Sequence, residues 1–530
     1  MRLITYATVV AVALGLTPVA GFGQSFEEGW EAYFDSDYQT ALEHFRPSAE
    51  QGNASSQFAL GLMYETGTGV DHNYQEAAAW YRLAAEQGDK YAQYNLGLMY
   101  ANGHGVPQDD QGAVVWFRRA AEQGYEDAQY NLGIMYLYGK GVPENPQETV
   151  VWFRRAADQG NGYAQRRLGI LYANGLGVPR NDQEAVTLFR YAAEQGDEDA
   201  QYNLGVMYTN GRGVPHDSQQ AIVWLRRAAD QGNANAQVKL GEIYANGTGS
   251  PQDGQESMAW FRRAADQGNA NAQVKLGEIY ANGIGIPQDD QEAVAWFRRA
   301  AEQGNANAQS DLGFMYAEGR GVRQSYQNAA EWHLRAARQG VAPALAHLGF
   351  LYEEGRGVSQ SDKHAVNLYR RAAEQGHAQS QARLGLMYAN GRGVPQSDQQ
   401  ALNWLRLSAD QGDPFGQYGL GLMSAEGRGV QQNYIHAAEW YQLAAEQGNT
   451  RAKVNLGNMY YNGQGVGENL VIAYALTTLA AADGDPTAKN NRDIIFARLS
   501  QEQVNEGQHL ASSWLVDTPL PTPQDVTTWP

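Results

Sequence analysis

The stretch RRAADQGNANAQVKLGEIYANG occurs twice without a change, at Arg226–Gly247 and at Arg262–Gly283. A catalytic site is assembled once in a domain, whereas a structural unit that stacks on copies of itself recurs as often as the array requires. The duplication therefore predicts a repeat protein. The rest of the sequence gives the length and the number of its repeats.

The dipeptide Gln-Gly, which closes the RRAADQG part of this stretch, marks the period. It recurs every 36 residues, and Asp483-Gly484 is a degenerate last copy. The other copies begin at Gln51, Gln87, Gln123, Gln159, Gln195, Gln231, Gln267, Gln303, Gln339, Gln375, Gln411 and Gln447. No insertion breaks the spacing, so we predict twelve repeats of 36 residues over residues 53–484. Position 1 of a repeat is the residue that follows this glycine.

The first half of each repeat has the pattern of a helix. In the repeat that starts at Asp89, Ala92, Leu96, Gly97 and Tyr100 occupy positions 4, 8, 9 and 12, which share one helical face. Glycine inside a helix costs about 1 kcal/mol relative to alanine. We therefore expect a neighbouring helix to approach closely at position 9.

The second half predicts another helix. Position 21 is a strong N-cap residue in all twelve repeats: Asn73, Asp109, Asn145, Asn181, Asp217, Asp253, Asp289, Ser325, Ser361, Ser397, Asn433 and Asn469. The helix usually carries Trp at position 28 and ends at the Gln-Gly, whose glycine suits a left-handed C-cap. A loop of the type NGxGVPQ joins the two helices, and its glycines permit positive φ. The predicted fold class is all-α, an α/α superhelical solenoid.

The two ends of the chain depart from the repeat. Residues 1–23 combine Arg2, an apolar run and small residues, which predicts a signal peptide cleaved after Gly23 and a periplasmic or secreted protein. An uncleaved membrane anchor is the alternative reading of this segment. Residues 24–52 and 485–516 are predicted to form capping helices, and the proline-rich residues 517–530 a disordered tail.

The composition excludes several kinds of site. The chain has no cysteine, so it forms no disulfide and has no thiolate for metal binding or catalysis. Acidic residues number 58 against 39 Lys and Arg, which argues against general binding to nucleic acid or anionic lipid. After the signal segment, no stretch is long and apolar enough to span a membrane.

The repeat unit, xAxAQxxLGxMYxNGxGVPQDxxxAxxWxRxAAEQG, resembles the Sel1-like repeat, a relative of the tetratricopeptide repeat, over roughly residues 26 to 516. The resemblance implies a right-handed α/α superhelix that acts as an interaction scaffold or adaptor. Exported bacterial members of this family act in envelope regulation, secretion and contact with host cells, so the resemblance implies a role of this kind. Some cysteine-rich members are β-lactam-binding or hydrolysing proteins, and the lack of cysteine separates this chain from that branch.

Local departures from the repeat pattern gather in one region. Ser424 replaces the usual Tyr and Gly416 the small Ala, while Leu188, Leu368 and Leu476 replace Trp. The repeats from Val341 to Gly448 are the least regular, which predicts a flexible or specialised part of the array.

Side chains at positions 3, 6, 10 and 13 should lie opposite the core face of the first helix, with position 7 at the edge. Tyr and Arg are enriched in binding hot spots, and Asn can bond a ligand backbone. We therefore predict a partner-binding wall in the groove, formed by Tyr91, Tyr94, Asn95, Tyr130, Asn131, Tyr163, Arg166, Arg167 and Tyr202. The alternative is that these regularly spaced aromatic residues pack on the neighbouring repeat.

A second candidate is a row of loop arginines at position 16, between the two glycines. The row consists of Arg320, Arg356, Arg392 and Arg428. Aligned by the solenoid, these side chains could hold an acidic partner segment or an envelope polyanion. The alternative is four solvated arginines with no partner role.

No catalytic constellation is found in the sequence. The ten histidines are scattered, no HExxH or GxSxG motif occurs, and the glycine-rich loops follow helices rather than strands. We predict no enzyme activity, no cofactor and no metal. The leading hypothesis is a scaffold that binds a protein or peptide partner in its groove. The alternatives are a peptidoglycan or glycan binder and, less favoured, a cell-wall or β-lactam hydrolase.

Overall fold

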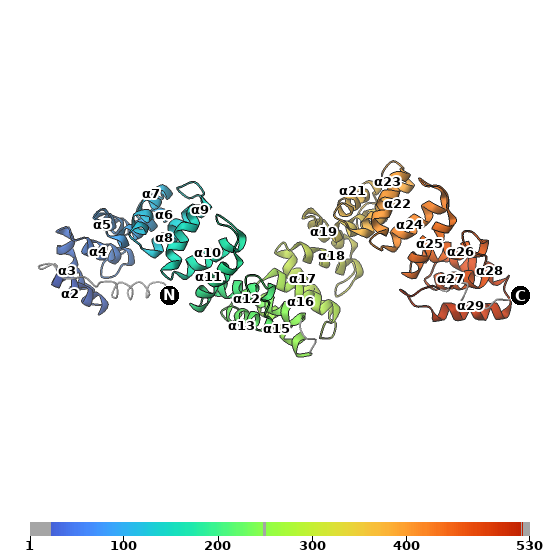
Figure 1. The fold of residues 1–530 in the computed structure, drawn as a ribbon, viewed down its shortest axis with the longest axis horizontal. Coiled ribbons are helices and arrows are strands. Elements are labelled where there is room, and N and C mark those ends of the chain that lie inside the picture. Colours follow the sequence, from blue (N-terminus) through green and yellow to red (C-terminus); the bar gives the residue numbers. More distant parts are fainter. Residues whose placement is uncertain (1–22, 247–250, 521, 523–530) are drawn as a thin grey trace. The chain divides into compact units, whose positions relative to one another are not determined.

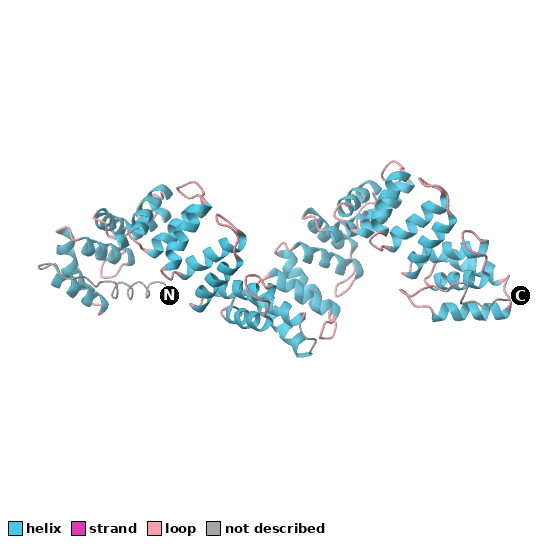
Figure 2. Ribbon diagram, viewed as in Figure 1, coloured by secondary structure: helices cyan, strands magenta, loops and turns pink. Residues whose placement is uncertain are grey.

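The computed structural model describes residues 23–246, 251–520 and 522. The predicted signal peptide therefore falls outside the described residues except for Gly23. All regular structure in the described part of the chain is helical, as Figure 2 shows. The chain divides into two compact units, Met1–Asn246 and Gly247–Pro530, each a row of paired helices. The predicted all-α repeat fold is confirmed.

The first unit consists of helices α2 to α14, most of which are labelled in Figure 1. They are α2 (Gly23–Phe34), α3 (Tyr38–Glu50), α4 (Ala54–Thr66), α5 (Tyr74–Glu86), α6 (Lys90–Asn102), α7 (Asp110–Glu122), α8 (Glu126–Tyr138), α9 (Pro146–Asp158), α10 (Gly162–Asn174), α11 (Asp182–Glu194), α12 (Glu198–Asn210), α13 (Ser218–Asp230) and α14 (Ala234–Ala245). Each even-numbered helix from α4 onward is the first helix of a repeat, and the odd-numbered helix after it is the second.

The second unit contains the remaining helices. They are α15 (Pro251–Asp266), α16 (Ala270–Asn282), α17 (Asp290–Glu302), α18 (Ala306–Glu318), α19 (Tyr326–Arg338), α20 (Ala342–Glu354), α21 (Asp362–Ala373), α22 (Ala378–Asn390), α23 (Asp398–Ala409), α24 (Pro414–Glu426), α25 (Tyr434–Glu446), α26 (Thr450–Asn462), α27 (Leu470–Ala482), α28 (Pro486–Phe496) and α29 (Gln501–Ser513). In both units, consecutive helices pack against each other, except that α29 packs on α27.

The predicted caps and turns form, with one exception. Asp109 accepts a hydrogen bond from the backbone N–H of Gln111 at 3.0 Å, and the other second helices begin in the same way. The exception is Asp253: α15 already begins at Pro251, so this aspartate lies in the first turn and is not the N-cap. The loop glycines adopt positive φ as predicted. A Cβ on Gly105, at φ +69°, would stand 2.0 Å from the carbonyl oxygen of Tyr74 in the preceding repeat.

The glycine at position 9 provides the predicted close approach. A Cβ on Gly133 would lie 2.5 Å from the ring of Phe153, a fully buried residue of the second helix at position 29 of the repeat. The same contact recurs between Gly97 and Phe117. The aromatic ring thus takes the space that an alanine methyl group would need, which offsets the cost of the helical glycine.

Two ladders of polar contacts connect successive repeats. In the glutamine ladder, Gln93 at position 5 donates to the carbonyl of Ala85 at 3.0 Å, and Gln123 at position 35 donates to the Gln93 side chain at 2.8 Å. In the arginine–tyrosine ladder, an arginine at position 30 donates to the position-12 tyrosine of the next repeat, as from Arg190 to Tyr208 at 2.9 Å. Both ladders satisfy polar groups at the joints between repeats, which fixes the spacing of the array.

The C-terminal segment corrects one prediction. We predicted disorder for residues 517–530, but residues 517–520 fold back on the array: the Asp517 N–H donates to the carbonyl of Glu446 at 2.8 Å and Leu520 is 3% exposed. The buried leucine and the backbone hydrogen bond offset the ordering entropy of this short stretch. Residues 521 and 523–530 of this predicted tail lie outside the described residues. Among the residues that the structure describes, no helix has the length and apolar character to cross a membrane.

Candidate binding site

The predicted tyrosine wall of the first unit is largely engaged in packing. Tyr94 is buried, its ring centroid lies 5.9 Å from that of Phe117, and its hydroxyl accepts a hydrogen bond from Asn131 at 3.1 Å. Tyr130 stacks on Phe153 of its own repeat with a centroid distance of 5.6 Å, and its ring lies 6.1 Å from that of Tyr163 in the next repeat. Asn95 is also buried. These four predicted residues stabilise the joints between repeats, and their role toward a partner stays a prediction.

The other predicted residues of the wall differ in exposure. Tyr163 is exposed by 51%, whereas Tyr202 is half-buried. Tyr91 lies with its ring 5.3 Å from that of Tyr125, and burial raises the pKa of its hydroxyl. Of this wall, Tyr163 therefore presents the largest free aromatic surface.

The two predicted arginines of the wall differ in their partners. The Arg166 guanidinium lies 3.1 Å from a carboxylate oxygen of Asp197 and 3.3 Å from one of Asp199. Nε of Arg167 is buried without a hydrogen-bond partner among the described residues. Arg166 thus forms ion pairs with the next repeat and is not a free cation.

Three of the four loop arginines form similar clamps. Each pairs with the aspartate 30 residues earlier, at the start of the second helix of the preceding repeat: Arg320 with Asp290 at 2.6 Å, Arg392 with Asp362 at 2.8 Å and Arg428 with Asp398 at 2.8 Å. Arg212 pairs with Asp182 in the same way, and together with Arg180 lowers the pKa of Asp182 to about 2. These charges are already neutralised within the chain.

Arg356 is the exception in this row. The residue 30 positions earlier is Tyr326, whose hydroxyl accepts a hydrogen bond from the guanidinium at 3.3 Å. The guanidinium carbon also lies 5.4 Å from the centroid of the Tyr326 ring and 5.5 Å from that of Phe350. Within the described part of the chain, no carboxylate forms an ion pair with Arg356.

The repeats around Arg356 break both ladders. Position 29 is His333 rather than Phe, Tyr or Leu. Position 30 is Leu334 rather than Arg, and position 5 of the next repeat is Leu345 rather than Gln. Arg371 compensates for the missing glutamine, because it donates at 3.0 Å to the carbonyl of Ala337, the one that a glutamine at position 5 would bind. The backbone of the array is therefore maintained where its side-chain pattern is lost.

A cavity of about 250 Å³ lies at this break, on the face of α18, α20 and α22. Its lining includes Phe314, His333, His347, Phe350, Arg356 and Arg383, and we call it the histidine cavity. Ala346, at position 6, also lines it, where the first unit carries Tyr94 and Tyr130. The small side chain leaves space at a position where Tyr94, Tyr130 and Tyr202 place a ring in three repeats of the first unit.

The two histidines of this cavity are neutral at physiological pH. His333 is 1% exposed, and burial together with the nearby His347 lowers its pKa to about 3. The two ring centroids are 5.1 Å apart, and Phe314 stacks on His347. Burial also lowers the pKa of His347. Nδ1 of each ring is buried without a hydrogen-bond partner among the described residues, which is costly unless a ligand or water supplies one.

A second cavity of about 580 Å³ adjoins the first and shares Phe350 and Arg383 with it. Its lining continues over α22 and α24 to the start of α26, and we call it the arginine cavity. Besides the shared residues it is lined by Arg392, Phe415, Tyr418 and Arg451.

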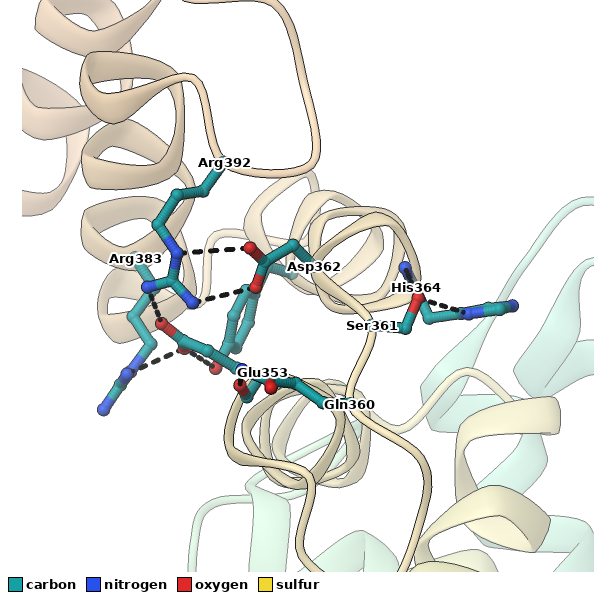
Figure 3. A network of polar contacts seen from close by, with 8 residues as sticks. Glu353, Gln360, Ser361, Asp362, His364, Arg383 and Arg392 are labelled. Carbon is teal, nitrogen blue, oxygen red and sulfur yellow. Dashed lines mark hydrogen bonds and ion pairs between the residues drawn. The ribbon is translucent and has the colours of Figure 1, made fainter.

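Glu353 lies at the centre of a network of polar contacts, which Figure 3 shows. This carboxylate is buried and accepts a hydrogen bond from the Tyr369 hydroxyl at 2.9 Å. It also pairs at 2.9 Å with Arg383 and at 2.9 Å with Arg392, which in turn reaches Asp362. The network fixes both guanidinium groups and raises the Arg392 pKa, chiefly through its hydrogen bond to Asp362.

The arrangement suits binding rather than catalysis. Phe350 lies between the Arg356 and Arg383 guanidinium groups, at 5.5 Å and 5.1 Å from its centroid, so apolar surface and positive charge are presented together. No group of three or more His, Cys, Asp or Glu side chains suited to a metal ion is found in the described ranges.

Of the residues predicted from the sequence, Arg356 and Arg392 line these cavities, and the other central residues were missed. His333, His347, Phe350 and Glu353 were not among the candidates, although both cavities overlap the segment Val341–Gly448, whose irregularity is visible in the sequence. The usable signal was the loss of ladder residues at positions 5, 29 and 30 in consecutive repeats.

Comparison with known proteins agrees with the repeat pattern. The Sel1 repeat profile matches consecutive segments that run without a gap from 23–53 to 450–485. This chain belongs to the Sel1 repeat family. The profile treats the opening hairpin α2–α3, which we assigned to a cap, as a repeat of its own, and so counts 13 repeats. A Sel1 repeat array typically acts as a protein-interaction scaffold and not as a catalyst.

Two solved structures resemble this Sel1 repeat protein. One is c5321, a protective antigen present in uropathogenic Escherichia coli strains: it is 36% identical, with a TM-score of 0.71 over 82% of this chain and 94% of that chain. The other is a Sel1 repeat protein from Oxalobacter formigenes, 37% identical, with a TM-score of 0.50 over 65% of this chain and 99% of that chain. The comparison with curated proteins gives no match.

Proposed function

We propose that this Sel1 repeat protein is a non-catalytic scaffold of the bacterial cell envelope that binds a segment of another protein along the first helices of its second unit. The observation that carries the proposal is the pair of adjoining cavities joined at Phe350 and Arg383. Together they offer aromatic side chains and fixed guanidinium groups over several successive repeats, which is the form of site that an extended peptide needs.

The regular repeats support this assignment by contrast. In the first unit, side chains of the array itself fill the corresponding positions, as Tyr94 and Tyr130 do. In the second unit, Phe314 and Phe415, exposed by 38% and 40%, line the two cavities. Partly exposed aromatic residues beside a concave pocket are typical anchors of protein interfaces.

The envelope location rests on the N-terminal sequence and on one similarity. The signal-like segment 1–23 supports export to the periplasm or beyond. The related c5321 is a protective antigen, which supports contact of the relative, and by extension of this chain, with a host. Cell fractionation and N-terminal sequencing of the mature protein test this part: we expect Gln24 as the first residue in the periplasmic or secreted fraction. A mature protein that keeps residues 1–23 would contradict it.

The binding function is tested with a peptide-display library screened against the mature protein. We expect enriched peptides whose affinity falls at least about tenfold in Phe350→Ala, a loss of about 1.4 kcal/mol. Tyr163→Ala is the matched control, since it removes an exposed aromatic residue from the predicted wall of the first unit. Binding that is lost in Tyr163→Ala and kept in Phe350→Ala would move the site to that wall. Absence of any enriched peptide together with sedimentation on purified sacculi would favour glycan binding instead.

A further inference from the structure

We propose that the histidine cavity recognises a carboxylate attached to an apolar or aromatic group, either the C-terminal residue of the partner segment or an acidic side chain next to an apolar one. This inference rests on the proposed function and names the chemistry that the site selects.

The first support is the unpaired charge of Arg356. The other loop arginines of this row, Arg320, Arg392 and Arg428, are neutralised by an aspartate of the preceding repeat. Arg356 has Tyr326 in place of that aspartate, and the tyrosine offers a ring and a hydroxyl but no negative charge. A guanidinium group that forms an aromatic contact keeps donors free for a carboxylate, which it can bind with two parallel hydrogen bonds.

The second support is independent and lies deeper in the cavity. His333 is 1% exposed, its ring lines the cavity, and its Nδ1 has no hydrogen-bond partner among the described residues. Nδ1 of His347 is in the same state. In the two neighbouring repeats position 29 carries Phe297 and Tyr369, and the Tyr369 hydroxyl donates a hydrogen bond to Glu353. The buried imidazole of His333 therefore contributes a polar group that repeat packing does not require, which is consistent with a role in binding.

The walls specify an apolar neighbour for the carboxylate. Phe314 and Phe350 lie on successive first helices, and Leu351 completes the apolar lining. A volume of about 250 Å³ is enough for one large side chain but not for a folded element. The cavity therefore fits a single residue of an extended chain.

The remaining polar groups also fit a peptide. Gln379 and Ser380 line the cavity, and Glu318 lies in its wall without an ion pair in the described part of the chain. A carboxylate in this place repels a second free anion, but it accepts hydrogen bonds from peptide N–H groups. Arg356 and Glu318 thus favour a chain that carries both a carboxylate and an amide over a bare anion such as phosphate.

The experiment compares three fluorescein-labelled octapeptides on the full mature protein by fluorescence anisotropy. The first ends in Phe with a free carboxylate, the second is the same peptide amidated, and the third is amidated and carries an internal Asp before Phe. We expect the free acid to bind at least about tenfold more tightly than its amide, because a charged hydrogen-bonded pair is lost. Comparable binding of the internal-Asp peptide identifies a side-chain carboxylate as the source, and weak binding identifies the C-terminus.

Two variants test the assignment of the carboxylate to Arg356. Arg356→Gln should abolish the preference for the free acid, whereas the matched change Arg320→Gln, at a paired arginine, should leave it intact. Tyr326→Asp supplies the aspartate of the other repeats, so it should neutralise Arg356 from within and abolish the preference while Arg356 is retained. Thermal melting establishes that each variant is folded.

The outcomes separate this inference from the proposed function. Equal binding of all three octapeptides, or a preference that survives Arg356→Gln, overturns the carboxylate inference. Failure of all three octapeptides overturns it too, while library peptides that depend on Phe350 would still support the scaffold function. Failure of both the octapeptides and the library overturns both proposals.

Discussion

The repeats between residues 90 and 233 and those between residues 306 and 413 have the same backbone plan but use it differently. In the first group the glutamine ladder passes from one repeat to the next without a break, from Gln93 to Gln123 and on to Gln231. In the second group it is interrupted at Leu345 and resumes at Gln381, and a cavity lies beside the break. In a repeat array, a departure from the pattern therefore marks the place where a side chain serves something other than stacking.

The irregular repeats remain folded because contacts are replaced rather than lost. Arg371 satisfies the carbonyl that has no glutamine, and the Glu353 network connects three successive helices by ion pairs. The cost in stability is expected at His333, whose buried Nδ1 has no hydrogen-bond partner among the described residues. Exchanging residues between the two regions tests this account.

The largest effect is expected from placing the irregular residue in a regular repeat. Phe153→His puts an imidazole into a fully buried site against Gly133. It removes ring contacts and buries an unsatisfied nitrogen, so we expect the free energy of unfolding to fall by about 3–5 kcal/mol. Denaturant unfolding followed by circular dichroism measures it. A loss below about 1 kcal/mol would mean that position 29 tolerates histidine in any repeat and that His333 is unremarkable.

The reverse exchange should stabilise the protein, and more so in acid. The pKa of His333 is about 3 in the folded state against 6.5 for an ordinary histidine, so its contribution to stability is present above pH 6.5 and is lost as the pH falls toward 3. His333→Phe removes this loss, and we expect a gain of about 2 kcal/mol at pH 5 beyond that at pH 8. Melting curves at both values give the difference.

Three other titratable groups near His333 could obscure that result. His347 and His377 also have lowered pKa values, and Glu318 acts on His347 in the opposite sense. The control is His347→Asn at both pH values. If it reproduces the whole pH-dependent gain, the sensitivity belongs to His347 and not to the ring at position 29.

A third exchange concerns position 7, where the first unit carries Asn131 and the second carries Asp311. Burial and the nearby Glu278 raise the pKa of Asp311 to about 6, so its contribution is greatest below pH 3.8 and is lost as the pH rises through 6. Asp311→Asn should therefore stabilise the protein at pH 7.5 by about 2 kcal/mol and have little effect at pH 3.5. Asp290→Asn, whose pKa is lowered by Arg320, should have the opposite sign at pH 7.5.

Most of the fold could be predicted from the sequence because each repeat contains the residues that cap its helices and form its turns. Asn73 and Gly105, for example, are readable as an N-cap and a positive-φ turn without knowledge of the neighbouring repeats. The failure at Asp253 and the ordered residues 517–520 have a common cause, since both depend on contacts or helix extensions that local propensity does not encode.

The site was harder to predict because helical periodicity tells which face of a helix a side chain lies on but not how deeply it is buried. Tyr94 and Tyr163 both fall on the predicted binding face, yet one is buried against the next repeat and the other is exposed by 51%. Likewise, Arg320 and Arg356 are identical in a repeat alignment. The difference lies in the partner 30 residues earlier, Asp290 or Tyr326, and only the packing of successive repeats shows that these residues meet.

The smallest expected effect follows from that pair of arginines and is also the most specific. Arg320→Gln breaks a partly buried ion pair with Asp290 and should lower the free energy of unfolding by about 1 kcal/mol, less at high salt. Arg356→Gln removes two aromatic contacts and a long hydrogen bond to Tyr326 but no ion pair, so it should cost at most about 0.5 kcal/mol, with little dependence on salt. Urea unfolding at 0.05 M and about 1 M salt compares the two. Equal losses with equal salt dependence would show that Arg356 has a carboxylate partner within the chain, and the argument that its charge is kept for a ligand would fail.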